Sequence, residues 1–201
     1  MIEFFFDISS PWTYLAFHNV QPLARELEVR IAWRPILVGG IFNTVNPAVY
    51  EFRDHGAPGK KRYLEKDLGD WARHTGLAIR FPPAVFPVNS VKAMRACIFL
   101  EPEGKLPDFA RAAFEAYWGD DQDISDDGVL RAVCVKAGVD ADPVLSGIAA
   151  PAIKDQLRIN TEELVARGGF GTPTMFVNGD DMYFGNDRLQ LVREAVLRAR
   201  G

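Results

Sequence analysis

The chain has 201 residues, a formal net charge of −4 at pH 7, and 48% hydrophobic against 25% charged residues. This is the composition of an ordinary globular protein, long enough for one domain with a large insertion or for two small domains. Because the net charge is negative and the basic residues form no stripe, neither nucleic acid nor a membrane surface is expected as a main partner.

The N-terminal segment predicts a βαβ unit. Ile2 to Phe6 is a short apolar run, typical of a strand buried on both faces, and its acidic residues make it unlike a secretion signal. Ser9-Ser10-Pro11 indicates a helix start, because serine caps helices and proline suits the first turn. Apolar residues at helical spacing follow as far as Leu27, and Glu28 to Ile36 alternates as a second strand does. The two strands are expected to be parallel.

The middle of the chain, from Leu37 to about Gly168, contains little that indicates strand. No apolar run in the sequence approaches the length of about 20 residues that spans a bilayer. Helical patterns alternate with loops rich in Gly, Pro and Asn, such as Val38-Gly39-Gly40. Helices are expected over Lys60–Thr75, Ser90–Leu100, Pro107–Trp118, Asp127–Ala137 and Pro151–Arg167, with a further short one within Asp140–Ala149.

Two cysteines, Cys97 and Cys134, lie far apart within these helical patterns. We interpret them as small buried hydrophobic residues of a protein in a reducing compartment, which makes the cytoplasm the expected location. A structural disulfide or a catalytic thiol is the alternative.

The C-terminal segment returns to strand signals. Thr174 to Val177 and Met182 to Phe184 flank Asn178-Gly179, a typical hairpin turn, and a last amphipathic helix follows. With the N-terminal unit this predicts an α/β protein with a thioredoxin-like fold, in which an all-helical domain is inserted between the βαβ and ββα halves. Residues 1–37 and 169–201 are expected to form the discontinuous thioredoxin-like domain, and residues 38–168 the helical insertion.

Ligands of open α/β sheets bind beyond the carboxyl ends of the strands, which here is the segment from Asp7 to Tyr14. Thioredoxin-type oxidoreductases carry Cys-x-x-Cys at this corner, whereas Ser10 and Thr13 hydroxyls stand at those two positions here. An alcohol cannot form a mixed disulfide, but it can donate a hydrogen bond to a thiolate supplied from outside. The corner therefore predicts either a site that activates a thiol cofactor at Ser10 or a plain helix cap.

Two later segments favour the thiol cofactor. Pro173 precedes an apolar strand, where the thioredoxin fold has a cis proline, and Thr172 before it would offer its backbone to an extended peptide such as glutathione. Gly185-Asn186-Asp187 begins the last helix, where free amides favour an anion and the two side chains could hold an ammonium. Each segment alone also fits an ordinary loop proline or a helix cap.

Three motifs in this order resemble the 2-hydroxychromene-2-carboxylate isomerase family, relatives of the kappa-class glutathione transferases. They are Phe-x-Phe-Asp-x-x-Ser-Pro-x-x-Tyr at Phe4 to Tyr14, Phe-Gly-x-Pro-Thr-Met-Phe at Phe170 to Phe176, and Gly-Asn-Asp-Arg-Leu at Gly185 to Leu189. The segment from Lys60 to Leu68 is similar to the first helix of that family's insert, and the resemblance runs over essentially the whole chain.

The resemblance implies reduced glutathione as the cofactor, no metal, and a homodimer. Ser10 would activate the sulfur, and Thr172 with Pro173 would pair with the cysteinyl backbone. Gly185, Asn186 and Asp187 would hold the γ-glutamyl end. Asn46 and Lys60 are similar to polar groups that face glutathione or the second substrate from the insert.

The resemblance also implies a reaction: glutathione-dependent cis–trans isomerisation in aromatic catabolism, by thiolate addition, rotation and elimination. Trp12 and Phe42 would line the pocket of a small aromatic or chromene carboxylate, whereas Trp118 is expected in the core. The sequence departs from the family pattern in one respect: Leu37 to Tyr50 contains no Lys or Arg that could hold the substrate carboxylate. Arg53, Lys60 or Lys61 would have to hold it instead. The alternatives are a kappa-like transferase or peroxidase, and a non-enzymatic peptide-binding module.

Overall fold

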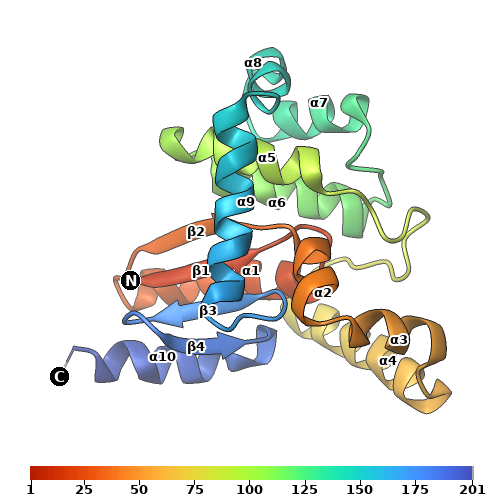
Figure 1. Ribbon diagram of the computed structural model, residues 1–201, viewed down its shortest axis with the longest axis vertical. Helices are drawn as coiled ribbons and strands as arrows, with labels where there is room; N and C mark the ends of the chain where they lie inside the picture. Colours follow the sequence, from red (N-terminus) through yellow and green to blue (C-terminus); the bar gives the residue numbers. More distant parts are fainter. Residues whose placement is uncertain (201) are drawn as a thin grey trace.

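The computed structural model describes residues 1–200; Gly201 and the side chain of Arg53 lie outside the described part. Its centre is a four-stranded sheet of β1 (Ile2–Phe6), β2 (Ile31–Pro35), β3 (Thr174–Val177) and β4 (Asp181–Phe184), in the order β2-β1-β3-β4. β1 and β2 are parallel, and the other two pairs are antiparallel. This confirms the thioredoxin-like fold, with the helical segments inserted between β2 and β3 (Figure 1).

Both faces of the sheet are covered. Helices α1 (Pro11–Glu26) and α10 (Leu189–Arg198) lie on one face, and α9 (Pro151–Ala166) crosses the other (Figure 1). Phe4 accordingly packs edge-on against Phe17 of α1, with ring centroids 6.4 Å apart. Because successive side chains of β1 face two covered layers, every residue of the strand except Glu3 is apolar and buried.

The other helices between β2 and β3 belong, with α9, to the insertion. The predicted helices are all present, and the short one expected near residue 145 is α8. They are α4 (Pro58–Thr75), α5 (Val91–Leu100), α6 (Leu106–Phe114), α7 (Asp127–Lys136) and α8 (Ala141–Gly147), joined by the short turns η1 (Glu101–Glu103) and η2 (Glu115–Gly119). One hydrophobic core runs from the α1 face of the sheet into these helices, through the stacked pair Tyr14 and Phe114 with centroids 5.0 Å apart. The domain boundaries at 37/38 and 168/169 stay predictions.

The loop predicted at Val38-Gly39-Gly40 is wrong, because helix α2 (Val38–Val45) begins there and α3 (Ala48–His55) follows. The free amide of Val38 is satisfied by the Asp7 carboxylate across 2.9 Å, a contact that a local pattern does not contain. Helix α2 also packs against α9, and the Leu37 amide before it donates to the Thr161 hydroxyl of α9 at 3.0 Å. Tertiary contacts thus override the local preference of glycine for loops.

The second strand is shorter than predicted. It begins at Ile31 rather than Glu28, because Glu28 adopts a left-handed conformation with φ of 51° where the chain turns out of α1. Apart from that end, β1, β3 and the last helix fall where the periodicity indicated.

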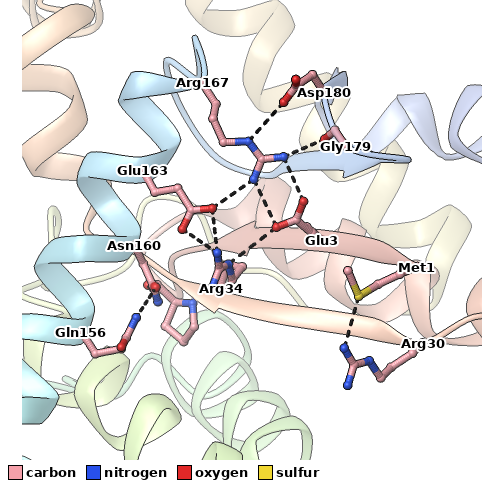
Figure 2. Close-up of polar contacts among 11 residues, drawn as sticks. Met1, Glu3, Arg30, Arg34, Gln156, Asn160, Glu163, Arg167, Gly179 and Asp180 are labelled. Atoms are coloured by element: carbon pink, nitrogen blue, oxygen red, sulfur yellow. Dashed lines mark hydrogen bonds and ion pairs between the residues drawn. The ribbon is translucent and has the colours of Figure 1, made fainter.

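A charged cluster fixes the C-terminal end of α9 to the sheet (Figure 2). The Arg167 guanidinium donates to Glu3 of β1 at 2.9 Å and to Glu163 at 3.1 Å, and lies 3.8 Å from the ring centroid of Phe176. Arg34 of β2 donates to Glu163 at 2.6 Å. Because α9 leads into the loop before β3, this cluster also helps to place that loop.

We expect Arg167→Met to lower the free energy of unfolding by roughly 1–3 kcal/mol, because the half-buried Glu3 carboxylate loses its hydrogen-bond donor and Glu163 keeps only Arg34. Urea denaturation measures the loss. The matched control is Arg158→Met, which removes an exposed pair with Glu162 and should cost under about 0.5 kcal/mol. Equal losses in both variants would contradict the role given to the cluster.

Candidate active site

Three segments meet at the carboxyl end of β1: the turn that enters α1, the loop before β3, and the turn η3 (Asn186–Arg188) that enters α10. The first contact is between Ser10 and Thr172, and the second is the Gly185 amide, which donates to the Pro173 carbonyl at 3.0 Å. The structure therefore brings Ser10, Thr172, Pro173 and Gly185 together at one corner of the sheet, and their roles in binding and catalysis stay predictions.

Ser10 is the N-cap of α1, in an extended conformation, and its hydroxyl oxygen accepts the Thr13 amide at 3.3 Å. The same oxygen lies 3.5 Å from the Thr172 carbonyl, at the long limit for a hydrogen bond. The Ser10 side chain is only half-buried. Its hydroxyl proton is thus available to a better acceptor that arrives from outside.

Thr13, the second hydroxyl of the corner, has a different role. It is fully buried, and its oxygen lies 2.9 Å from that of Thr172, which itself donates to the Phe5 carbonyl at 3.3 Å. The Thr13 hydroxyl is therefore the donor to Thr172, and the chain of bonds pins the loop before β3 to α1. The Thr172–Pro173 peptide is cis, as the fold predicted.

The backbone before Ser10 is held by the helical insertion. The indole of Trp118 donates to the Ile8 carbonyl at 2.8 Å, and the Ile8 amide faces the Met94 sulfur at 3.4 Å. Trp118 is fully buried, which confirms it as a core residue, and it belongs to a turn of π-helix, a feature frequent near functional sites. Sequence analysis missed this link, because the pairing joins residues 110 positions apart.

The start of the last helix contains an unsatisfied polar group. Asn186 is 7% exposed, and within residues 1–200 its side-chain amide nitrogen has no hydrogen-bond partner. Gly185 before it has φ of 108°, and a Cβ there would lie 2.8 Å from the Asp187 carboxylate, so only glycine fits. Asp187 is half-exposed and paired with Arg188. A ligand carboxylate at this helix start would give Asn186 the partner it lacks.

The two polar groups predicted from the insert are placed differently. Asn46 ends α2, and its amide donates to the Phe170 carbonyl at 3.1 Å, so it braces the loop before Thr172. Lys60 is exposed in the first turn of α4. Their contacts with a cofactor stay predictions.

Of the predicted substrate residues, Trp12 is half-buried in the first turn of α1, and Phe42 packs edge-on against Tyr50 with centroids 6.1 Å apart. Arg53 lies in α3, and its side chain is outside the described residues. Their substrate contacts also stay predictions.

An aromatic pair beside the site escaped the sequence analysis. Phe170 and Phe184 lie with centroids 4.5 Å apart and remain 40% and 39% exposed. Phe184 and Phe42 flank Gly171, since a Cβ at Gly171 would lie 2.9 Å from the first and 3.9 Å from the second. Phe170 opens the second quoted motif and Phe184 directly precedes the third, and a large aromatic residue beside a glycine at a ligand-binding corner was the signal available.

The cysteines take no part in the site. Cys97 and Cys134 are both buried and free, which confirms the interpretation as small core residues. Burial raises the pKa of both thiols above the ordinary value, so neither is a thiolate at neutral pH.

The fold and the site define a thioredoxin-type protein whose redox cysteines are replaced by hydroxyls. Residues 1–197 match the family model of the DSBA-like thioredoxin domain. The chain belongs to this family, and within it to the group of 2-hydroxychromene-2-carboxylate isomerases and kappa-class glutathione transferases. Within the described residues, no helix has the length and apolarity needed to span a membrane.

Three relatives show the similarity. A 2-hydroxychromene-2-carboxylate isomerase of Sphingobium xenophagum is 30% identical over 202 residues, covering 98% of this chain and 97% of the relative. Human glutathione S-transferase kappa 1 is 29% identical over 209 residues, covering 95% of this chain and 88% of the relative. A solved structure of 2-hydroxychromene-2-carboxylate isomerase superposes with a TM-score of 0.84 at 27% identity, over 98% of this chain and 95% of the other.

We expect Thr13→Val to lower the free energy of unfolding by about 1–3 kcal/mol, because it keeps the shape but leaves Thr172 without its buried donor. Thermal or urea unfolding measures the change. Thr44→Val is the matched control, since Thr44 is exposed on α2 and its loss should cost under about 0.5 kcal/mol. A Thr13→Val variant as stable as this control would contradict the buried chain of bonds.

Proposed function

We propose that this protein is a glutathione-dependent cis–trans isomerase acting on a small aromatic or chromene carboxylate. The observation that carries the proposal is the half-buried Ser10 hydroxyl at the N-cap of α1, where redox members of the fold have a thiolate. The similarity to proteins named 2-hydroxychromene-2-carboxylate isomerase supports the reaction class.

The residues of the site fit glutathione. Asn186, buried and without a partner for its amide nitrogen among the described residues, suits the γ-glutamyl carboxylate, and Asp187 is exposed enough to receive the ammonium. The loop at Thr172 and Pro173 would pair with the cysteinyl backbone of a peptide. These groups lie on two elements that meet at Gly185, so one short peptide can reach both.

When bound, glutathione supplies a thiolate that adds reversibly to the substrate double bond, so that rotation about the bond becomes possible. Ser10 donates a hydrogen bond to the sulfur and, with the free amides of α1, favours its ionised form. The peptide clamp at Thr172 fixes the position of the sulfur, which contributes to rate through orientation.

The second substrate would lie against the aromatic side chains of the site. Trp12 and Phe42 are the predicted wall, and Phe184 extends it past Gly171. Flat apolar side chains exclude water and stack on a flat substrate. Arg53, Lys60 or Lys61 would hold its carboxylate. The cytoplasmic location and the homodimer stay predictions.

One observation favours a second function, a kappa-like glutathione transferase. The human kappa-class relative is almost as similar to this chain as the isomerase is, and α2 carries no Lys or Arg to hold a carboxylate. The two activities differ in mass balance, because a transferase consumes glutathione during turnover and an isomerase leaves its total unchanged. Titration of free thiol before and after complete conversion separates them.

We expect reduced glutathione at a hundredfold its dissociation constant to stabilise the folded protein by about 2.7 kcal/mol, seen as a rise of a few degrees in the unfolding temperature. Asp187→Ala should lose this rise, because the ammonium has no counter-charge. Asp155→Ala, an exposed carboxylate on α9, is the matched control and should keep it. No rise in the parent protein at millimolar glutathione would refute the cofactor and move the peptide-binding alternative to first place.

We also expect Ser10→Ala to lower kcat by about 100-fold or more, because the hydrogen bond to the sulfur is lost while the orienting clamp remains. Glutathione affinity should change little, since the γ-glutamyl contacts are untouched. Ser146→Ala, an exposed serine on α8, controls for the substitution itself. A Ser10→Ala variant with the same kcat as the parent protein would contradict the role given to this hydroxyl.

A further inference from the structure

One carboxylate, that of Asp7, is buried beneath the site with 1% of its surface exposed. Its Oδ1 accepts the Ser9 amide at 2.9 Å, and its Oδ2 accepts the Val38 amide at 2.9 Å. The hydroxyls of Ser90, before α5, and of Ser9 are further donors to it. A buried carboxylate is costly unless it is paired or hydrogen-bonded, and here the donors are backbone amides and hydroxyls rather than a cation.

The two amides lie on opposite sides of the site. Ser9 directly precedes Ser10, whose own amide donates to the Asp7 carbonyl at 3.2 Å and closes the turn. Val38 is the first residue of α2, the helix that lies at the carboxyl ends of β1 and β2 (Figure 1). An ordinary capping carboxylate serves the start of one helix, whereas Asp7 joins the turn before α1 to the start of α2.

The contacts close a ring around the site. From Asp7 the ring passes along α2 to Asn46, whose amide donates to the Phe170 carbonyl at 3.1 Å. Phe170 leads through Gly171 to Thr172, whose carbonyl faces the Ser10 hydroxyl at 3.5 Å. From Ser10 the turn returns to Asp7. Every step of the ring is a short covalent path or a hydrogen bond between described residues.

Burial raises the pKa of Asp7 above its usual range, and the hydrogen bonds from Ser9, Val38 and Ser90 lower it in part. Burial is the larger of these effects, and no charged side chain is among the partners that lower the pKa.

We infer that Asp7 is a positioning residue that holds the Ser10 hydroxyl and helix α2 at a fixed separation. The inference rests on the proposed function, since it assigns the sulfur to Ser10 and the apolar wall to Phe42 of α2. If sulfur and substrate are held on these two segments, their relative position decides the rate, and a shift of about 1 Å can cost on the order of 100-fold.

The direct test is Asp7→Asn in the full chain. Asparagine keeps one acceptor oxygen, but its amide group cannot accept the second backbone N–H, so one of the two segments is released. We expect kcat to fall on the order of 10- to 100-fold, while the dissociation constant of glutathione measured by calorimetry stays at the parent value. Asp126→Asn makes the same change at a carboxylate that caps only α7, and its kcat should match the parent.

A second variant removes the link without touching the carboxylate. Val38→Pro deletes the amide that donates to Asp7 at the first residue of a helix, a position that proline favours. Leu37 before it is already extended, with φ of −111° and ψ of 106°, as a residue before proline must be. We expect kcat to fall on the order of 10- to 100-fold, as in Asp7→Asn, because the same link between Asp7 and α2 is lost.

Parent values of kcat in both folded variants would overturn the inference. A measurement without glutathione separates it from the proposed function: amide hydrogen exchange of Ser9 and Val38 in the parent and in Asp7→Asn. Faster exchange at either amide supports the link, and unchanged protection at both overturns it, whatever glutathione does. A parent protein that binds no glutathione would instead refute the proposed function.

Discussion

The structure depends on how the chain leaves its central strand. β1 is buried on both faces, so the turn that follows cannot use water for its backbone groups and must find partners within the protein. Asp7 supplies the Ser9 amide with an acceptor, and Trp118 supplies the Ile8 carbonyl with a donor. The helical insertion is therefore part of the corner at which Ser10 is displayed, and the sheet alone would not hold that corner.

The chemistry of the corner follows from the replacement of a cysteine sulfur by a serine oxygen at the start of α1. A helix N-terminus stabilises negative charge, and a cysteine there becomes a reactive thiolate. Serine is too weak an acid to ionise in the same place, so the helix start is free to stabilise the charge of a ligand. Thr13, which stands at the second redox position, is fully buried and bonded to Thr172, so only one of the two hydroxyls faces outward. In the proposed function, the site would bind the sulfur of a ligand where redox members of the fold carry their own.

Much of this could be predicted from the sequence, where the signals are local. The strand from Ile2 to Phe6 and the helix after Ser10 follow from periodicity and capping, and the turn Asn178-Gly179 gave the terminal hairpin. Helix α2 was missed because its first amide is satisfied by Asp7, 31 residues away. No local pattern of glycines contains that contact.

The site shows the same division. Ser10, Thr172 and Gly185 could be predicted as candidates because each stands at a strand end or helix start of a recognisable topology. The aromatic residues beside them, such as Phe184 at Gly171, were missed because their closeness depends on tertiary packing. The substrate is the least predictable part for the same reason, since the proposed wall combines Trp12 of α1, Phe42 of α2 and Phe184 of β4.

The central claim is that Ser10 activates the sulfur of bound glutathione. The most direct test is the pKa of that thiol in the complex, measured from thiolate absorbance against pH in the parent and in Ser10→Ala. In the parent protein, the account predicts a thiol pKa well below that of a free thiol, about 8.5. In the variant, it predicts that the thiol pKa rises toward that free value. The same thiol pKa in both proteins would contradict it.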